Sequence, residues 1–134
     1  MKKWNLAAIA GLLALAGCGQ PEPMTADKVV AALQAAGTGI TAVKTLERDP
    51  ASPRPSSFRE NIAFALPSVA PKGGQVFVCD KPEYCDAIFS YYDALKGLAG
   101  PYLYRSGDGL VVAQLNSGLE PKAAEQVQAV IEAL

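Results

Sequence analysis

The residues in this sequence that could most readily take part in chemistry are its three cysteines, Cys18, Cys79 and Cys85. Cys79 and Cys85 have the spacing C-x5-C, which differs from the C-x-x-C of thiol–disulfide catalysts. The 134 residues include no histidine, which excludes Ser-His-Asp and Cys-His catalysis and most zinc and haem sites. A structural disulfide is therefore the favoured interpretation of the pair, with a redox-active thiol pair as the alternative.

The N-terminal segment has the layout of a secretory signal. Lys2 and Lys3 precede an apolar run from Leu6 to Ala16, which is followed by Gly17 and Cys18. Eleven residues of helix would span roughly 16 Å, about half of a bilayer core of roughly 30 Å. The run is thus too short for a permanent transmembrane helix and is typical of a signal peptide.

The sequence Leu15-Ala16-Gly17-Cys18 resembles the lipobox of bacterial lipoproteins. The resemblance implies cleavage before Cys18 and acylation of this residue with at least two long chains of the palmitate type, which suffice for stable anchoring. We therefore expect residues 1–17 to be a signal peptide, residues 18–24 a lipidated cysteine and linker, and residues 25–134 a single domain. An exported chain with Cys18 acylated leaves Cys79 and Cys85 as an even pair for a disulfide.

The resemblance to lipoproteins also implies a location. Gly19 follows the cysteine at the place where an aspartate would favour retention in the inner membrane. We expect the protein in the cell envelope, on the outer membrane facing the periplasm if the cell has two membranes. In a cell with one membrane it would lie on the outer face of the plasma membrane.

The composition is that of a folded domain with little affinity for nucleic acid. Half of the residues are hydrophobic and 19% are charged, which is enough apolar material for a core and too little charge for a disordered polyelectrolyte. The formal net charge is −1, with no long basic run. This balance excludes DNA and RNA as expected partners.

The hydrophobic pattern predicts eight elements in the order α-β-β-β-α-β-β-α. A stretch with three prolines, residues 49–57, is expected to be an extended loop. The order predicts an α+β domain of two layers, in which an antiparallel sheet of about five strands carries helices packed on one face. The predicted helices cover residues 26–36, about 80–97 and 120–134, and the predicted strands cover 40–47, 58–66, 75–79, 101–105 and 110–115.

The middle helix has the strongest signal for its start. Asp80 and Glu83 form a capping-box pattern, and Pro82 sits in the first turn. The acidic group formed by Asp80, Glu83 and Asp86 is interpreted as helix capping, because carboxylates are favoured at a helix N-terminus. A calcium site or a catalytic acid pair is the less favoured interpretation, since a calcium-binding loop pattern is absent.

Tyrosines and arginines are the candidate binding residues. Tyr102 and Tyr104 share one face of a predicted strand, which is either packed core, the favoured interpretation, or a recognition platform. Arg48, Arg54 and Arg59 surround the proline-rich loop, where they either hold an anionic partner or, as favoured, belong to a solvated loop that caps the sheet. The binding hypothesis combines Arg54 with Tyr102 and Tyr104 in one surface.

The chain resembles a group of small bacterial lipoproteins of uncharacterised function. The resemblance rests on Asp49-Pro50, Arg54-Pro55 with Phe58, Gly73-Gly74 before an apolar strand, and the segment from Gly109 to Leu119. No activity is attached to that group, so the resemblance implies no site residue beyond the lipobox.

The function expected from the sequence is that of a non-enzymatic envelope lipoprotein with no cofactor and no metal. It would contact the membrane through Cys18 and bind an envelope protein or a small molecule. The alternative is an enzyme, either a thiol–disulfide catalyst using Cys79 and Cys85 or a hydrolase using acids near Asp80.

Overall fold

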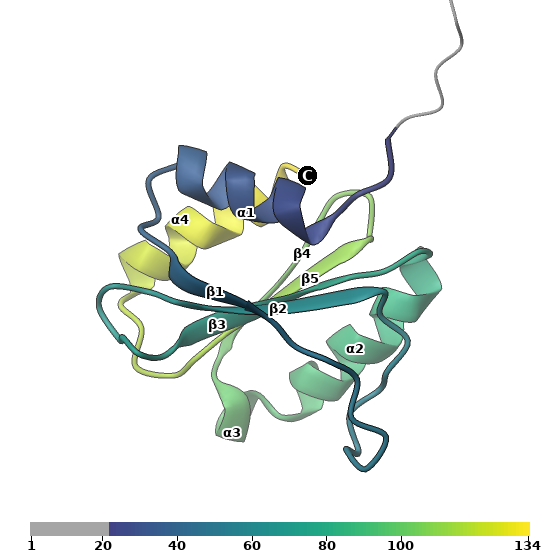
Figure 1. The fold of residues 1–134 in the computed structure, drawn as a ribbon. Helices are drawn as coiled ribbons and strands as arrows, with labels where there is room; N and C mark the ends of the chain where they lie inside the picture. Colours follow the sequence, from purple (N-terminus) through teal and green to yellow (C-terminus); the bar gives the residue numbers. More distant parts are fainter. Residues whose placement is uncertain (1–21) are drawn as a thin grey trace, which may run out of the picture.

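The computed structural model describes residues 22–134 (Figure 1). The predicted signal peptide and the predicted lipidation site at Cys18 lie outside the described residues. Within residues 22–134, no helix combines the length and the apolar composition that crossing a membrane requires. The elements are α1 (Ala26–Ala35), β1 (Thr41–Thr45), β2 (Glu60–Ala65), β3 (Gly73–Val78), α2 (Pro82–Ala94), α3 (Lys96–Ala99), β4 (Tyr102–Arg105), β5 (Val111–Leu115) and α4 (Pro121–Glu132).

The five strands form one sheet in the order β1-β2-β3-β5-β4, with every neighbouring pair antiparallel. The α+β class and the five-stranded antiparallel sheet are confirmed, and the short α3 is the one element that the predicted order lacks. β3 and β5 are central neighbours because the chain crosses through α2 and α3 to the far edge and returns by the β4–β5 hairpin. β1 and β4 form the two edges.

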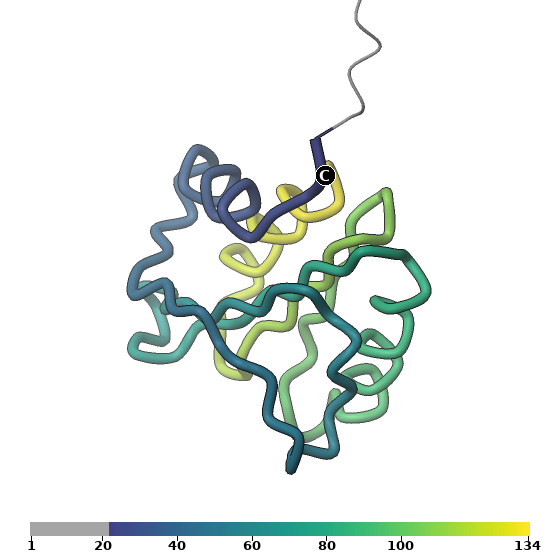
Figure 2. Tube along the Cα trace, turned by 45° about the vertical axis from the view of Figure 1, so that its right-hand side comes forward, coloured from purple at the N-terminus to yellow at the C-terminus, as the bar shows by residue number. Residues whose placement is uncertain are grey.

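The prediction that the helices pack on one face of the sheet is wrong. α1 and α4 cover one face, here named the helix-pair side, while α2 covers the opposite face, named the α2 side (Figures 1 and 2). The physical reason lies in the central strands. Val76 and Val78 are buried on the helix-pair side and Phe77 on the α2 side, and a strand that is apolar on both faces needs a cover on each.

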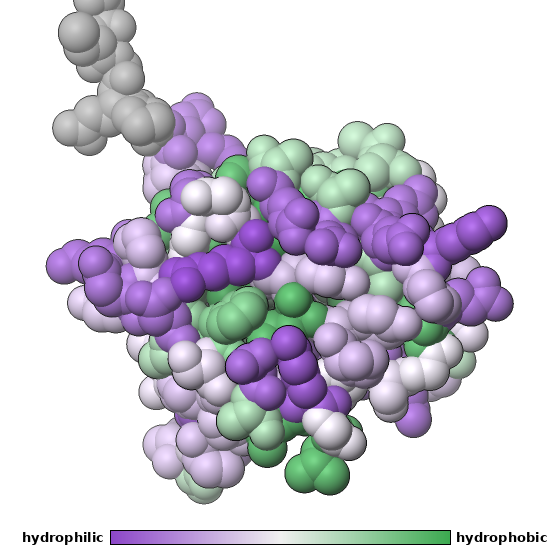
Figure 3. All heavy atoms as spheres, turned by 180° about the vertical axis from the view of Figure 1, so that it is seen from behind, coloured by the Kyte–Doolittle hydropathy of each residue, from purple (hydrophilic) through white to green (hydrophobic). Residues whose placement is uncertain are grey.

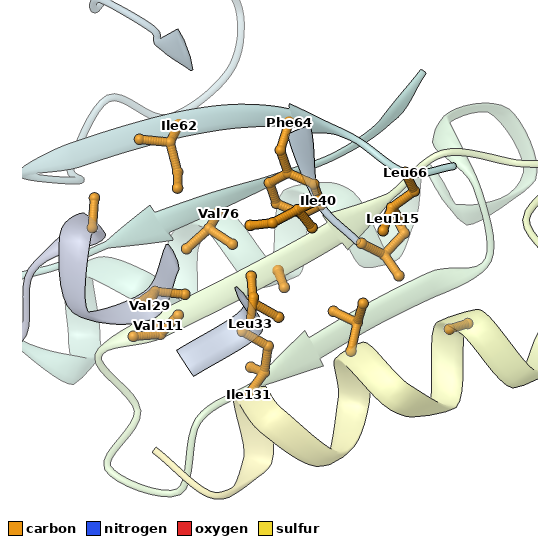
Figure 4. Packing of buried hydrophobic residues seen from close by; sticks show 14 of the residues in the cluster. Val29, Leu33, Ile40, Ile62, Phe64, Leu66, Val76, Val111, Leu115 and Ile131 are labelled. Atoms are coloured by element: carbon orange, nitrogen blue, oxygen red, sulfur yellow. The ribbon is translucent and has the colours of Figure 1, made fainter. Parts of the chain in front are cut away.

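The helix-pair side holds the larger part of the core. Val29 and Leu33 of α1 and Val127 and Ile131 of α4 are completely buried against the sheet. Figure 4 shows Val29, Leu33 and Ile131 converging with the inward-facing residues of β2, β3 and β5. Their burial on two amphipathic helices contributes to the apolar stabilisation of the domain. The strand residues on this side include Ile62, Phe64, Val76, Val78, Val111, Ala113 and Leu115.

The α2 side holds a smaller cluster. Ile88 and Tyr92 of α2 pack against Phe77 of β3 and Val112 of β5. The rings of Phe77 and Tyr92 lie 5.6 Å apart between centroids, and Phe58 packs edge-on against Phe77 at 5.3 Å. Aromatic contacts therefore replace much of the aliphatic packing found on the helix-pair side.

The starts of the helices are held in different ways. The hydroxyl of Thr25 accepts a hydrogen bond from the Lys28 backbone N–H at 3.3 Å and so caps the N-terminus of α1. The predicted capping box of α2 is wrong, because its N-cap is Lys81 and makes no side-chain hydrogen bond. Asp80 lies outside the helix and pairs with Arg59 instead. The Asp80 carboxylate therefore contacts Arg59, just before β2, and does not cap α2.

Gly74 of β3 lies in close contact with the neighbouring strand β5. A β-carbon on this residue would come within 2.6 Å of Leu115 Cδ2 and 2.7 Å of the Gln114 carbonyl oxygen. Only glycine fits at this approach. The Gly73-Gly74 pair therefore belongs to β3, which begins two residues before its predicted start at residue 75.

Candidate binding site

Arg54 lies on the α2 side, folded over two aromatic rings. Its guanidinium carbon is 5.3 Å from the ring centre of Phe58 and 5.1 Å from that of Phe77, which are cation–π distances. Its Nη1 donates to Gln75 Oε1 at 3.4 Å. The long loop that carries it hangs below the sheet on the same side as α2 (Figures 1 and 2). Arg54 is half-buried, so the loop places it against the sheet and not out in solvent.

Tyr102 and Tyr104 lie on the other side of the sheet from Arg54. They oppose Leu115 and Ala113 of β5 and pack, half-buried, against the helix-pair core. The Tyr102 hydroxyl donates to the Leu119 carbonyl oxygen at 3.1 Å. The favoured interpretation of the two tyrosines as packed core agrees with this position. The single surface formed from Arg54, Tyr102 and Tyr104 is not formed, because the strand alternation of β4 points the tyrosines away from Arg54.

Tyr104 has a perturbed acidity. Partial burial raises the pKa of its hydroxyl above the ordinary value of 10.0, and the neighbouring Tyr102 and the carboxylates of Glu132 and Glu125 add to the rise. Each cause disfavours the phenolate, through loss of hydration or through repulsion of a second negative charge. The effect operates in the alkaline range and gives Tyr104 no proton-transfer role near neutrality.

Cys79 and Cys85 form a disulfide, with 5.7 Å between their Cα atoms. Cys79, just after β3, is 1% exposed, and Cys85, in the first turns of α2, is fully buried. The bridge ties the start of α2 to the sheet on the α2 side and lies within the cluster of Phe58, Phe77 and Val112.

The acidic group at the start of α2 is dispersed among separate partners. Asp80 pairs with Arg59, and Asp86 pairs with Arg105. The described part of the chain holds no cluster of three or more cysteine or carboxylate side chains placed to bind a metal ion.

A row of amide side chains crosses the α2 side of the sheet, and the sequence interpretation missed it. Gln75 Nε2 donates to Tyr92 Oη at 2.9 Å and to Gln114 Oε1 at 3.1 Å. Asn61 is 1% exposed and donates from Nδ2 to the Val76 carbonyl oxygen at 3.1 Å. The available signal was the presence of single amides within apolar strand segments, where each must find hydrogen-bond partners.

Asn61 has one unused hydrogen-bonding atom. Its Oδ1 is buried and accepts no hydrogen bond from any described residue. A buried carbonyl oxygen without a donor is costly and is normally satisfied by water or by a bound group. This oxygen has almost no solvent-accessible surface, so it lies within the packing around the strand and not on an open surface.

A hollow of about 400 Å³ lies beside Asn61. It is lined by residues 45–48, which end β1 and continue beyond it, and by residues 58–61 at the start of β2. The volume lies in the range of small-molecule sites, and the hollow is broadly open to solvent. We name it the arginine hollow, because Arg48 lines it and Arg54 lies against its Phe58.

The arginines divide into two pairs. Arg59 and Arg105 each contact a carboxylate, whereas Arg48 and Arg54 have no carboxylate of the described residues within ion-pair distance. Arg48 donates from Nε to the Phe58 carbonyl oxygen at 3.2 Å, and its guanidinium carbon is 5.6 Å from the Phe58 ring centre. Two cations without an acidic partner thus lie over one aromatic ring, and Arg48 is the one of the two that lines the hollow.

Exposed apolar residues do not offer a comparable site. Figure 3 shows apolar side chains reaching the surface in the middle of the face seen from behind, bordered by hydrophilic ones. The large apolar side chains that are exposed among the described residues are Val43, Tyr84 and Leu98, and they belong to three different elements. Isolated exposures of this kind are normal on a protein surface.

No protein-family model, curated protein or solved structure matches the chain. The candidate site therefore rests on the residues and geometry described above.

Proposed function

We propose that the protein is a non-enzymatic, lipid-anchored domain of the bacterial cell envelope that binds its ligand at the arginine hollow. The observation that carries the binding role is the hollow itself, whose lining includes Arg48, a cation without an acidic partner among the described residues. Side chains that lack partners inside the protein are available to a ligand.

The membrane anchor is supported by the lipobox pattern that ends in Cys18. The arrangement of the domain fits such an anchor. The described chain begins beside α1 at one end of the molecule, and the loop of residues 49–57 lies at the opposite end (Figures 1 and 2). A tether attached before residue 22 would therefore leave the loop that carries Arg54 directed away from the membrane.

The burial of the cysteine pair favours a structural bridge over the alternative of a redox enzyme. Thiol–disulfide exchange requires a thiolate to reach one of the two sulfurs, and catalytic cysteines are partly exposed for this reason. Cys79 and Cys85 are 1% and 0% exposed. We therefore propose that the bridge stabilises the α2 side and takes no part in chemistry.

The test of the anchor is the intact mass of the protein extracted from membranes, measured after alkylation with and without prior reduction. We expect a mass equal to residues 18–134 plus acyl chains, with two alkylated thiols only after reduction. A mass without lipid would overturn the anchor. Thiols that are alkylated without reduction would overturn the structural disulfide and return the redox enzyme to first place.

A further inference from the structure

β1 is an edge strand that stays exposed along its length. It is hydrogen-bonded to β2 on one side only, and all five of its residues are exposed. In Figure 1 it lies at the near edge of the sheet, with no helix or strand in front of it. The opposite edge differs, because the residues of β4 are half-buried and α4 packs against that strand. β1 is therefore the edge at which the sheet offers room for a further strand.

The backbone groups of Thr45 and Glu47 point away from β2. The Leu46 N–H donates to the Asn61 carbonyl oxygen at 2.8 Å, so Leu46 turns its own backbone groups toward β2. In an antiparallel ladder this direction alternates from one residue to the next, which turns Thr45 and Glu47 toward the open edge. Neither N–H donates to another backbone group among the described residues. The N–H and C=O groups of both residues are thus available to an added strand.

The side chains of Lys44, Leu46 and Arg48 lie on the α2 side of this edge. Leu46 is opposite Asn61, whose amide is on that side, and the guanidinium carbon of Arg48 is 5.6 Å from the ring centre of Phe58. Lys44 shares the side because side chains alternate along a strand. Both cations are exposed and lack a carboxylate of the described residues within ion-pair distance, whereas Leu46 is half-buried. The edge therefore presents two cations with an apolar side chain between them.

The charges argue against a second copy of the chain at this edge. The regular part of the edge begins at Lys44, since the register is irregular between Thr41 and Lys44 and Ala42 has a φ of 52°. An antiparallel β1–β1 pair that uses the stretch up to Arg48 centres on Leu46. It would place Lys44 of each copy opposite Arg48 of the other, and like charges directly opposite are destabilising. A strand with carboxylates at these positions replaces the repulsion by attraction.

We propose that the β1 edge beside the arginine hollow binds an extended peptide segment of another protein as an added antiparallel strand. The segment carries acidic residues at positions i and i+4 and an apolar residue at i+2. The acidic side chains pair with Lys44 and Arg48, and the apolar one lies against Leu46, which lines the hollow. The antiparallel direction continues that of the sheet. The inference deepens the proposed function and rests on its binding role, but not on its membrane anchor.

The test is a titration of the ¹⁵N-labelled, membrane-extracted protein in detergent with the peptide acetyl-TETVTET-amide, followed in ¹H–¹⁵N spectra. We expect binding, with slower hydrogen exchange of the Thr45 and Glu47 amides as they gain acceptors. The matched control is acetyl-TTEVETT-amide, which has the same composition but carries its acidic residues on the face opposite the valine. It should bind about fivefold to twentyfold more weakly, because two cross-strand charge pairs are lost.

Methylated peptides test the backbone hydrogen bonds. In the antiparallel register, the N–H groups of the two threonines that flank the valine face β1, and the valine N–H faces solvent. N-methylation of these two threonines should abolish binding at millimolar concentration, whereas N-methylation of the valine should be tolerated. Equal binding of the two methylated peptides overturns the added strand.

Charge reversal tests the pairing with Lys44. In the antiparallel register the C-terminal glutamate of the peptide faces Lys44, and the N-terminal one faces Arg48. Lys44→Glu should bind the parent peptide about tenfold more weakly and regain affinity with acetyl-TETVTKT-amide, but not with acetyl-TKTVTET-amide. Lys122→Glu is the matched control, since it makes the same substitution at an exposed residue of α4 on the helix-pair side. Thermal melting checks that both variants are folded.

The proposal is overturned if the parent peptide does not bind at millimolar concentration, if acetyl-TTEVETT-amide binds equally well, or if Lys122→Glu loses as much affinity as Lys44→Glu. A free protein that sediments as a dimer, with the Thr45 and Glu47 amides already protected, would assign the edge to a second copy and overturn it as well. Peptide-induced shifts at residues 58–61 without protection of these two amides would leave the hollow as a ligand site and overturn only the added strand. The intact mass of the same preparation decides the membrane anchor separately, so the failures can be told apart.

Discussion

The two sides of the sheet are packed with different kinds of side chain. On the helix-pair side, α1 and α4 cover the sheet with aliphatic residues that are completely buried. On the α2 side, a smaller cluster shares the sheet with the amides of Asn61, Gln75 and Gln114 and with the guanidinium of Arg54. A domain whose stability is secured on one side can keep polar groups on the other, where they are costly for folding and useful for binding.

The largest effect is expected from a substitution on the helix-pair side. Leu33→Ala should lower the free energy of unfolding by about 2 to 5 kcal/mol, because it leaves a cavity at a fully buried position. Urea denaturation measures the change. Leu98→Ala is the control, because that side chain is 86% exposed and its loss should change stability by less than about 0.5 kcal/mol. Equal effects of the two substitutions would contradict the assignment of the core to this side.

The next effect is expected from the disulfide on the α2 side. The Cys79→Ser, Cys85→Ser double variant should lose about 2 kcal/mol of stability, because the bridge no longer restricts the unfolded chain. The same urea experiment measures it, and reduction of the parent protein should give a similar loss. Ligand binding should persist at temperatures at which the variant is folded. An unchanged unfolding midpoint would show that the bridge is not structural.

A smaller loss is expected from the amide row. Gln75→Leu should cost about 1 to 2 kcal/mol, since it leaves Tyr92 and Gln114 without their shared partner. Gln126→Ala is the matched control, as its hydrogen bond to the Ala36 carbonyl oxygen is exposed. A stability equal to that of the parent protein would contradict a contribution of the amide row to folding.

The smallest effect concerns the pH dependence of Tyr104. Its pKa is raised in the folded protein, so the folded state holds the phenolic proton more tightly than the unfolded chain does. The contribution of Tyr104 to the free energy of unfolding should therefore be constant below about pH 10. It should be lost as the pH rises through the pKa that Tyr104 has in the folded protein. Tyr104→Phe should make the alkaline decline shallower in melts recorded between pH 8 and about pH 11.5. An identical decline in both proteins would mean that Tyr104 is not responsible.

Much of the fold was accessible from local patterns. Residues at helical spacing such as Val29 and Leu33 predict α1, and its observed bounds differ from the predicted ones by one residue at the C-terminal end. The burial of both faces of the sheet was missed. A run of consecutive apolar residues, such as Val76-Phe77-Val78, does not indicate which helix packs on which face. That information resides in long-range packing against α2.

The candidate site was accessible only in part. Arg48 and Arg54 could be singled out by their position around a proline-rich loop, and a disulfide between Cys79 and Cys85 by its spacing. The link from Arg54 to Gln75 joins residues 21 positions apart and depends on how the loop folds back over β3. The resemblance to small lipoproteins and the lipobox at Cys18 stay predictions.

The most direct test of the division between the two sides is a comparison of ¹H–¹⁵N spectra of the full chain in detergent micelles before and after reduction of the Cys79–Cys85 disulfide. We expect the reduction to shift the amide signals of α2 and of the residues that pack around the two cysteines, such as Phe58 and Phe77. The amides of α1 and α4 should stay unchanged. Shifts centred on α1, α4 or the strand of Tyr102 and Tyr104 would contradict that division.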